Sequence, residues 1–85
     1  MAHGIGPVGS ASAVLSVWEH VSDAESLTNA AVRTAVFLSH VNDVPGEVVI
    51  AIDSLANGFC VSGDGIRAIV RHLQELARLE EFLTG

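Results

Sequence analysis

The sequence predicts one small domain that is mainly α-helical and contains a single short β element. The chain has 85 residues, of which 49% are hydrophobic, so it is long enough for one compact core and no more. From Ser62 to Ala77 the apolar residues gather on one side of a helix. From Thr28 to His40 apolar residues occupy almost every side, which predicts a central buried helix.

The first half of the chain predicts an arm followed by two helices. Residues 1–10 contain three glycines and a proline without periodicity, which indicates a flexible arm ahead of a domain at 11–85. A short apolar segment predicts a helix at 14–20, and the polar stretch at 22–26 suits a linker. Thr28 is a suitable N-cap, so the buried helix is expected to begin there.

The second half predicts a turn, a strand and two further helices. Asn, Asp, Pro and Gly between residues 42 and 46 end the buried helix. The β-branched run at 47–50 predicts the strand. A short helix is expected at 52–57, with Gly58 as its C-terminal stop, and Ser62 is expected to cap the amphipathic helix that follows.

Positive charge is concentrated on the amphipathic helix. The chain has no lysine, and three of its four arginines fall within twelve residues, at Arg67, Arg71 and Arg78. At 100° per residue these three form a narrow stripe opposite the apolar side. A basic stripe on an acidic protein predicts a surface for an anion, with nucleic acid as the first candidate, although charged outer faces are also common without a partner.

Composition excludes several classes of function. The net charge of −6 argues against a general nucleic-acid coat and against adsorption to anionic membranes, and no stretch approaches the length of a membrane span. The single cysteine, Cys60, cannot form a disulfide within the chain, so we expect a cytoplasmic protein with this thiol buried in a turn. The four histidines lack metal-ligand spacing, and no catalytic group is recognisable, so we expect no enzyme, metal or cofactor.

The segments at 52–57 and 62–77 together have the pattern of a helix-turn-helix. Small or apolar residues stand where two such helices cross, namely Leu55, Ala56, Val61, Ile66 and Ile69. Four motifs extend the pattern: Val-Trp-Glu-His at 17–20, His-Val-Asn-Asp at 40–43, Ile-Asp-Ser-Leu-Ala at 52–56 and Leu-Gln-Glu-Leu at 73–76. In this order they resemble the winged-helix domains of replication-initiator-like and transcriptional regulators of actinobacteria, their plasmids and their phages.

That resemblance implies a DNA-binding regulator of transcription or replication, with the helix at 62–77 in the major groove. The residues it implies for contact with double-stranded DNA are Ser62, Gly63, Asp64, Arg67, Arg71, His72 and Arg78. Arg67 is best placed to contact a base, and Arg71 or Arg78 to contact phosphate. The chain differs from the family pattern in placing Gly63, Asp64 and Gly65 after the capping serine, and it ends before a full wing, so we expect the wing to be short or missing.

A homodimer is expected, because two weak half-sites then add up. Its apolar contact is predicted from Leu79, Phe82 and Leu83 or from the segment around Trp18. The first three would point away from the core if the long helix continued past Ala77; the other possibility for this stretch is a strand.

The alternative function is a non-enzymatic protein-interaction module on the same scaffold, such as an anti-repressor, a phage inhibitor of a host factor or an assembly subunit. Electrostatic balance discriminates between the two functions. If Asp64, Glu75, Glu80 and Glu81 neutralise the arginines in space, protein binding is favoured. If the stripe remains positive, DNA binding is favoured.

Overall fold

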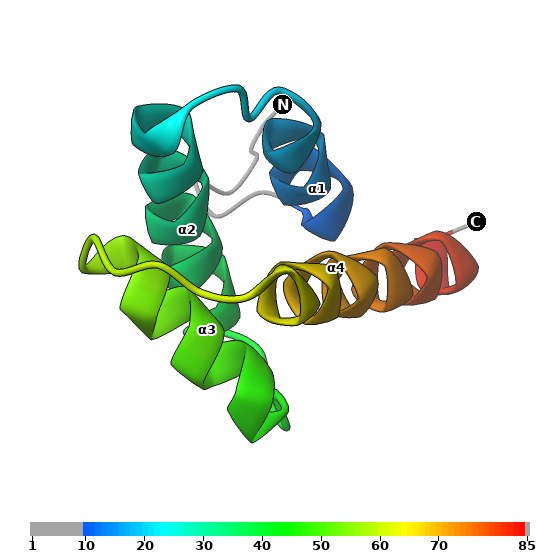
Figure 1. The fold of residues 1–85 in the computed structure, drawn as a ribbon. Coiled ribbons are helices and arrows are strands. Elements are labelled where there is room, and N and C mark those ends of the chain that lie inside the picture. Colours follow the sequence, from blue (N-terminus) through cyan, green and yellow to red (C-terminus); the bar gives the residue numbers. More distant parts are fainter. Residues whose placement is uncertain (1–9, 85) are drawn as a thin grey trace.

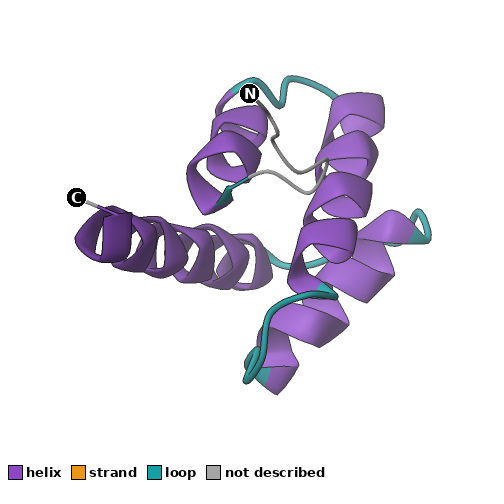
Figure 2. Ribbon diagram, turned by 180° about the vertical axis from the view of Figure 1, so that it is seen from behind, coloured by secondary structure: helices purple, strands orange, loops and turns teal. Residues whose placement is uncertain are grey.

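A computed structural model describes residues 10–84, and over this range the chain forms four helices and no strand (Figures 1 and 2). They are α1 (Ala11–Glu19), α2 (Ala24–Leu38), α3 (Gly46–Ala56) and α4 (Gly63–Thr84). The predicted mainly helical class is therefore confirmed, whereas the predicted β element is wrong. Apart from Ser10, the predicted N-terminal arm lies outside the described residues.

The predicted strand at 47–50 is the first part of α3, which begins at Gly46. Val48, Ala51, Ile52 and Leu55 recur at helical spacing and are at most 5% exposed. Burial of these four side chains outweighs the modest helix propensity of the β-branched residues. Apolar residues recur here every three to four positions, as in a helix, but the β-branched run at 47–50 also fits a short strand.

Side-chain caps fix where the helices begin. Asp23 and Ser26 form a capping box, in which the Ser26 N–H donates to Asp23 Oδ1 at 2.8 Å. α2 therefore begins four residues before the expected cap, Thr28, whose hydroxyl instead donates to the Ala24 carbonyl. The expected cap of α4 is confirmed, because Ser62 Oγ accepts from the Gly65 N–H at 3.2 Å.

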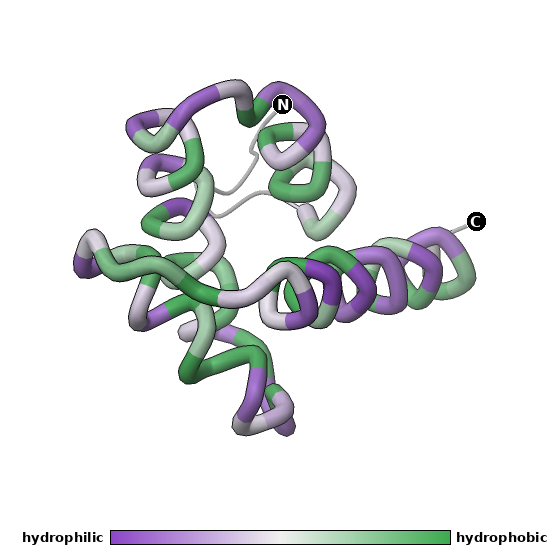
Figure 3. Tube along the Cα trace, viewed as in Figure 1, coloured by the Kyte–Doolittle hydropathy of each residue, from purple (hydrophilic) through white to green (hydrophobic). Residues whose placement is uncertain are grey.

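The four helices form a closed ring of contacts in which each packs on the next in sequence and α4 returns to α1 (Figure 1). Ile69 and Leu73 of α4 are completely buried at the centre of this arrangement. Figure 3 shows hydrophilic and hydrophobic residues alternating along α4 up to its C-terminal end. One face of α4 thus supplies the core while others remain exposed.

A buried polar link joins α1 to α2. Trp18 Nε1 donates to Thr34 Oγ1 at 2.8 Å, and the Thr34 hydroxyl donates to the Ala30 carbonyl at 2.7 Å. Trp18 is 9% exposed and Thr34 is fully buried, so each polar atom needs the partner it has. This placement removes Trp18 from the expected dimer contact.

The last turns of α4 pack against the start of α1. Both carboxylate oxygens of Glu80 accept from the Ala11 N–H, at 2.9 and 3.0 Å, and Ala11 is fully buried. Of the two conformations considered for residues 78–83, the structure shows the helix.

Replacing Thr34 by valine preserves volume but leaves the Trp18 N–H buried without an acceptor. We expect the free energy of unfolding, measured by urea denaturation, to fall by about 1–3 kcal/mol. Thr28→Val is the matched control, because this hydroxyl also donates to a carbonyl four residues earlier, but at a half-buried residue and not in the core. Equal losses in both variants would contradict the importance of the Trp18–Thr34 link.

The capping box of α2 predicts a pH-dependent contribution to stability. The pKa of Asp23 lies below its ordinary value of 3.8, because its carboxylate accepts hydrogen bonds from Ser26. The bond from the Ser26 backbone N–H has the larger effect, and the bond from the Ser26 side chain has the smaller one. The resulting stabilisation is present above pH 3.8 and is lost as the pH falls through the lowered pKa. Asp23→Ala should therefore lower the thermal midpoint at neutral pH, and the difference from wild type should shrink in acid; a constant difference would exclude a charge contribution.

Candidate functional site on the exposed face of α4

The connection between α3 and α4 spans residues 57–62 and begins with a tight turn that ends α3. Gly58 has φ 86°, its N–H donates to the Leu55 carbonyl at 3.0 Å, and the Phe59 N–H donates to the Ser54 carbonyl at 2.9 Å. This pair of bonds satisfies the last carbonyls of α3, and the left-handed backbone favours glycine. Gly58 is thus confirmed as the stop of α3, while the expectation of a buried Cys60 is wrong, because this thiol is exposed.

The arginine stripe (Arg67, Arg71 and Arg78) lies on the exposed side of α4. Ile69 and Leu73, which alternate with it in sequence, are fully buried. The core therefore fixes the rotation of the helix and holds the stripe outward. Arg71 and Arg78 also border a shallow groove of about 480 Å³ between α1 and α4, together with Ser12, Leu15, Gln74 and Glu81 among others.

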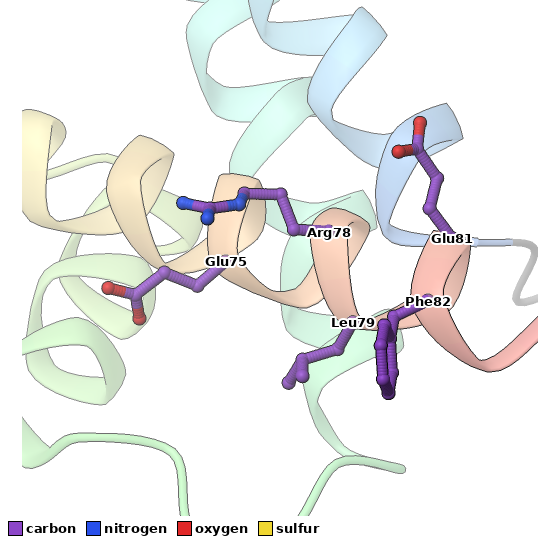
Figure 4. A pocket seen from close by; sticks show the side chains of 5 residues that line it. All are labelled: Glu75, Arg78, Leu79, Glu81 and Phe82. Carbon is purple, nitrogen blue, oxygen red and sulfur yellow. The ribbon is translucent and has the colours of Figure 1, made fainter.

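Carboxylate side chains lie near both ends of the arginine stripe. Asp64 forms an exposed ion pair with Arg67, one turn further along α4. Glu75 and Glu81 flank Arg78 in sequence on either side (Figure 4). Within residues 10–84, neither Arg71 nor Arg78 forms an ion pair.

Glu80 differs from the other three acidic residues of α4, because it faces α1. Three carboxylates, those of Asp64, Glu75 and Glu81, thus remain exposed on the same helix as the three arginines. Only the Asp64–Arg67 pair is in direct contact. The stripe is therefore partly neutralised at its N-terminal end and open at Arg71.

The other residues predicted to contact DNA differ in their exposure to solvent. Ser62, Gly63 and Asp64 are exposed at the start of α4, although the Ser62 hydroxyl is engaged as the cap. The His72 side chain is only 13% exposed, with Nδ1 4.0 Å from a Glu75 oxygen and Nε2 buried without a hydrogen-bond partner. His72 therefore lies beside the arginine stripe and not on it.

No family model, curated protein or solved structure matches the chain. Among residues 10–84, no helix combines the length and apolar character that a membrane span requires. The same part of the chain brings together no group of three His, Cys, Asp or Glu side chains suited to holding a metal ion.

Gly63 and Gly65 lower the stability of the first turn of α4, because glycine is less favourable than alanine in a helix. A Cβ added at Gly65 would lie 3.6 Å from Ala51 and Val61 atoms, which is ordinary van der Waals contact. Gly65→Ala should therefore raise the free energy of unfolding by about 0.5–1 kcal/mol. Gly58→Ala is the opposing control, because its positive φ should make alanine cost about 1–2 kcal/mol; thermal denaturation of both measures the signs, and destabilisation by Gly65→Ala would contradict the prediction.

Proposed function

We propose that this domain is a helix-turn-helix regulator that binds double-stranded DNA through the N-terminal half of α4. The observation that carries the proposal is the arrangement of α3, the Gly58 turn and α4, which holds Arg67 and Arg71 outward opposite the buried Ile69 and Leu73. A helix presented in this way can enter the major groove. On this proposal the scaffold is of the winged-helix type with the wing short or missing, and the protein acts in the bacterial cytoplasm without catalysis.

The two arginines have complementary surroundings for this role. They are four residues apart, so their Cα atoms are separated by roughly 6 Å along the helix. Arg67 lies nearer the N-terminus, where groove-binding helices contact base edges, and Arg71 follows it toward the flanking phosphates. With one phosphate neutralised by Arg71, the logarithm of the affinity should fall with the logarithm of the salt concentration with a slope of roughly −1.

Asp64 opposes binding on this proposal. Its carboxylate pairs with Arg67 and would face the phosphates or the base edges. Contact between Arg67 and DNA therefore requires the exposed ion pair to open. The chain thus carries an internal competitor for one of its two principal DNA contacts, which predicts weak binding to random DNA.

The test is fluorescence anisotropy of a labelled random duplex at low and moderate salt. We expect Arg67→Ala/Arg71→Ala to abolish binding and Asp64→Asn to strengthen it several-fold, because the latter releases Arg67 from its carboxylate. Arg33→Ala is the matched control, since Arg33 is an exposed arginine on α2 and should leave binding within about twofold of wild type.

Two outcomes contradict DNA binding through α4. One is the absence of binding by the wild-type protein at low salt. The other is equal weakening by Arg33→Ala and by the double substitution, which would indicate attraction to total charge and not to this surface.

A second candidate is the protein-interaction module, and the partial neutralisation of the arginine stripe favours it. Exposed carboxylates on α4 match its arginines in number. Exposed aromatic and arginine side chains, such as Phe82 and Arg78, are typical of a protein contact. On this hypothesis neither the wild type nor the Asp64→Asn variant binds DNA.

A further inference from the structure

A groove of about 380 Å³ lies between α1 and α2, which are joined by the short connection at residues 20–23 (Figure 1). Its lining comes from the end of α1, the connection and the first two-thirds of α2, and consists of Ser16, Val17, His20, Ser26, Asn29 and Arg33. The volume lies within the range of roughly 300–1,000 Å³ that is usual for sites of small molecules. This α1–α2 groove therefore has room for a small ligand.

The charge in the α1–α2 groove is opposite to that of the chain as a whole. The chain has 10 acidic residues and 4 arginines, yet none of the described residues that line the groove is acidic, and one is an arginine. This residue, Arg33, is also the arginine that lies outside α4. A guanidinium that borders a groove without a carboxylate in its lining favours an anion as the ligand.

Three side chains around the groove have hydrogen-bond donors to offer. Within residues 10–84, the Arg33 guanidinium, the Asn29 amide and the Ser16 hydroxyl have no hydrogen-bond or ion-pair partner. Asn29 and Arg33 are four residues apart, so they lie on the same side of α2, and Ser16 borders the same groove from α1. Donors from two helices thus surround one space.

The other polar groups of the groove already have partners. His20 Nδ1 lies 2.9 Å from the Ser16 carbonyl oxygen, and because a carbonyl can only accept, Nδ1 carries the proton of this bond. The Ser26 hydroxyl donates to the Asp23 carbonyl and accepts from the N–H groups of Ser22 and Asp23. These bonds fix two walls of the groove and leave the donors of Ser16, Asn29 and Arg33 for a ligand.

We propose that the α1–α2 groove is a binding site for a small phosphate monoester, held by Arg33, Asn29 and Ser16. A phosphate monoester has three terminal oxygens that accept hydrogen bonds, so the guanidinium, the amide and the hydroxyl can each meet one. A carboxylate has only two oxygens, which the guanidinium fork would occupy by itself. It would leave the donors of Asn29 and Ser16 unused.

The organic part of the ligand has a place in the same groove. Val17 is half-buried in its lining and offers an apolar contact beside the polar groups. The groove is separate from the arginine stripe, because none of its lining residues belongs to α4. The inference therefore goes beyond DNA binding and does not depend on it.

Two carboxylates limit the expected affinity. Glu19 and Asp23 lie at the two ends of the connection between the helices, and both oppose a further anion, although the Asp23 carboxylate is engaged with the Ser26 N–H at 2.8 Å. Arg33 is exposed, so solvent and salt weaken its contact with phosphate. The dissociation constant for inorganic phosphate should therefore be roughly 1–10 mM at low salt.

A nuclear magnetic resonance titration of the full chain with inorganic phosphate, at constant ionic strength set by sodium chloride, tests the site. We expect the side-chain N–H signals of Arg33 and Asn29 to shift and to saturate. Acetate, added in the same way, should bind at least several-fold more weakly, because it lacks the third oxygen. Glycerol 3-phosphate should bind no more weakly than inorganic phosphate, because the groove has room for its organic part.

Substitutions identify the residues that hold the phosphate. Arg33→Ala and Asn29→Ala should each weaken phosphate binding at least several-fold, and Arg33→Lys should weaken it less than Arg33→Ala, because lysine keeps the charge and loses the fork. Arg71→Ala is the matched control, since Arg71 is an exposed arginine of α4, and it should leave the affinity within about twofold of wild type. Circular dichroism checks that each variant keeps its helix content.

Four results would overturn the proposal. They are a wild type without saturable shifts, an Arg33→Ala variant that binds phosphate as well as Arg71→Ala does, acetate that binds as tightly as phosphate, and displacement of phosphate by a random duplex without terminal phosphates. The last result would assign the groove to a nucleic-acid surface. Binding of DNA through α4 is measured separately by the Arg67→Ala/Arg71→Ala comparison, so failure of one proposal is distinguishable from failure of the other.

Discussion

The contact between Glu80 and the start of α1 closes the ring of four helices at its end. The Glu80 carboxylate accepts from the N–H of Ala11, a residue 69 positions earlier and fully buried. The first N–H groups of a helix lack partners within it and carry partial positive charge, so a carboxylate there supplies both a hydrogen bond and a favourable charge. Glu80 makes this contact from the last turns of α4, which runs to Thr84, and so holds those turns beside α1.

The length of α4 separates two regions of the arginine stripe. In the first half, Ile69 and α3 fix a face that presents Arg67 and Arg71 beside the competing Asp64. In the second half, α1 fixes a face that presents Arg78 beside the exposed Leu79 and Phe82. The sequence shows a single stripe, whereas the contacts of the folded chain give its two ends different neighbours.

The sequence predicted the features that depend on local pattern. The amphipathic face around Ile69 and Leu73, the Ser62 cap and the Gly58 stop all follow from nearest-neighbour chemistry and are confirmed. The strand at 47–50 was wrong because burial of α3 overrides β propensity, and the start of α2 was misplaced because two adequate caps, Asp23 and Thr28, lie close together. The Glu80–Ala11 contact and the burial of His72 depend on residues distant in sequence, so no local pattern reveals them. The DNA contacts and the dimer remain predictions.

The two arginines proposed to contact DNA differ in what the contact would cost. Arg67 must first leave Asp64, whereas Arg71 forms no ion pair within residues 10–84. Because the Asp64–Arg67 pair is exposed, opening it costs little, about 0–1 kcal/mol. Asp64 therefore changes the proposed affinity by no more than several-fold, and the small number of arginines on α4 limits the affinity further.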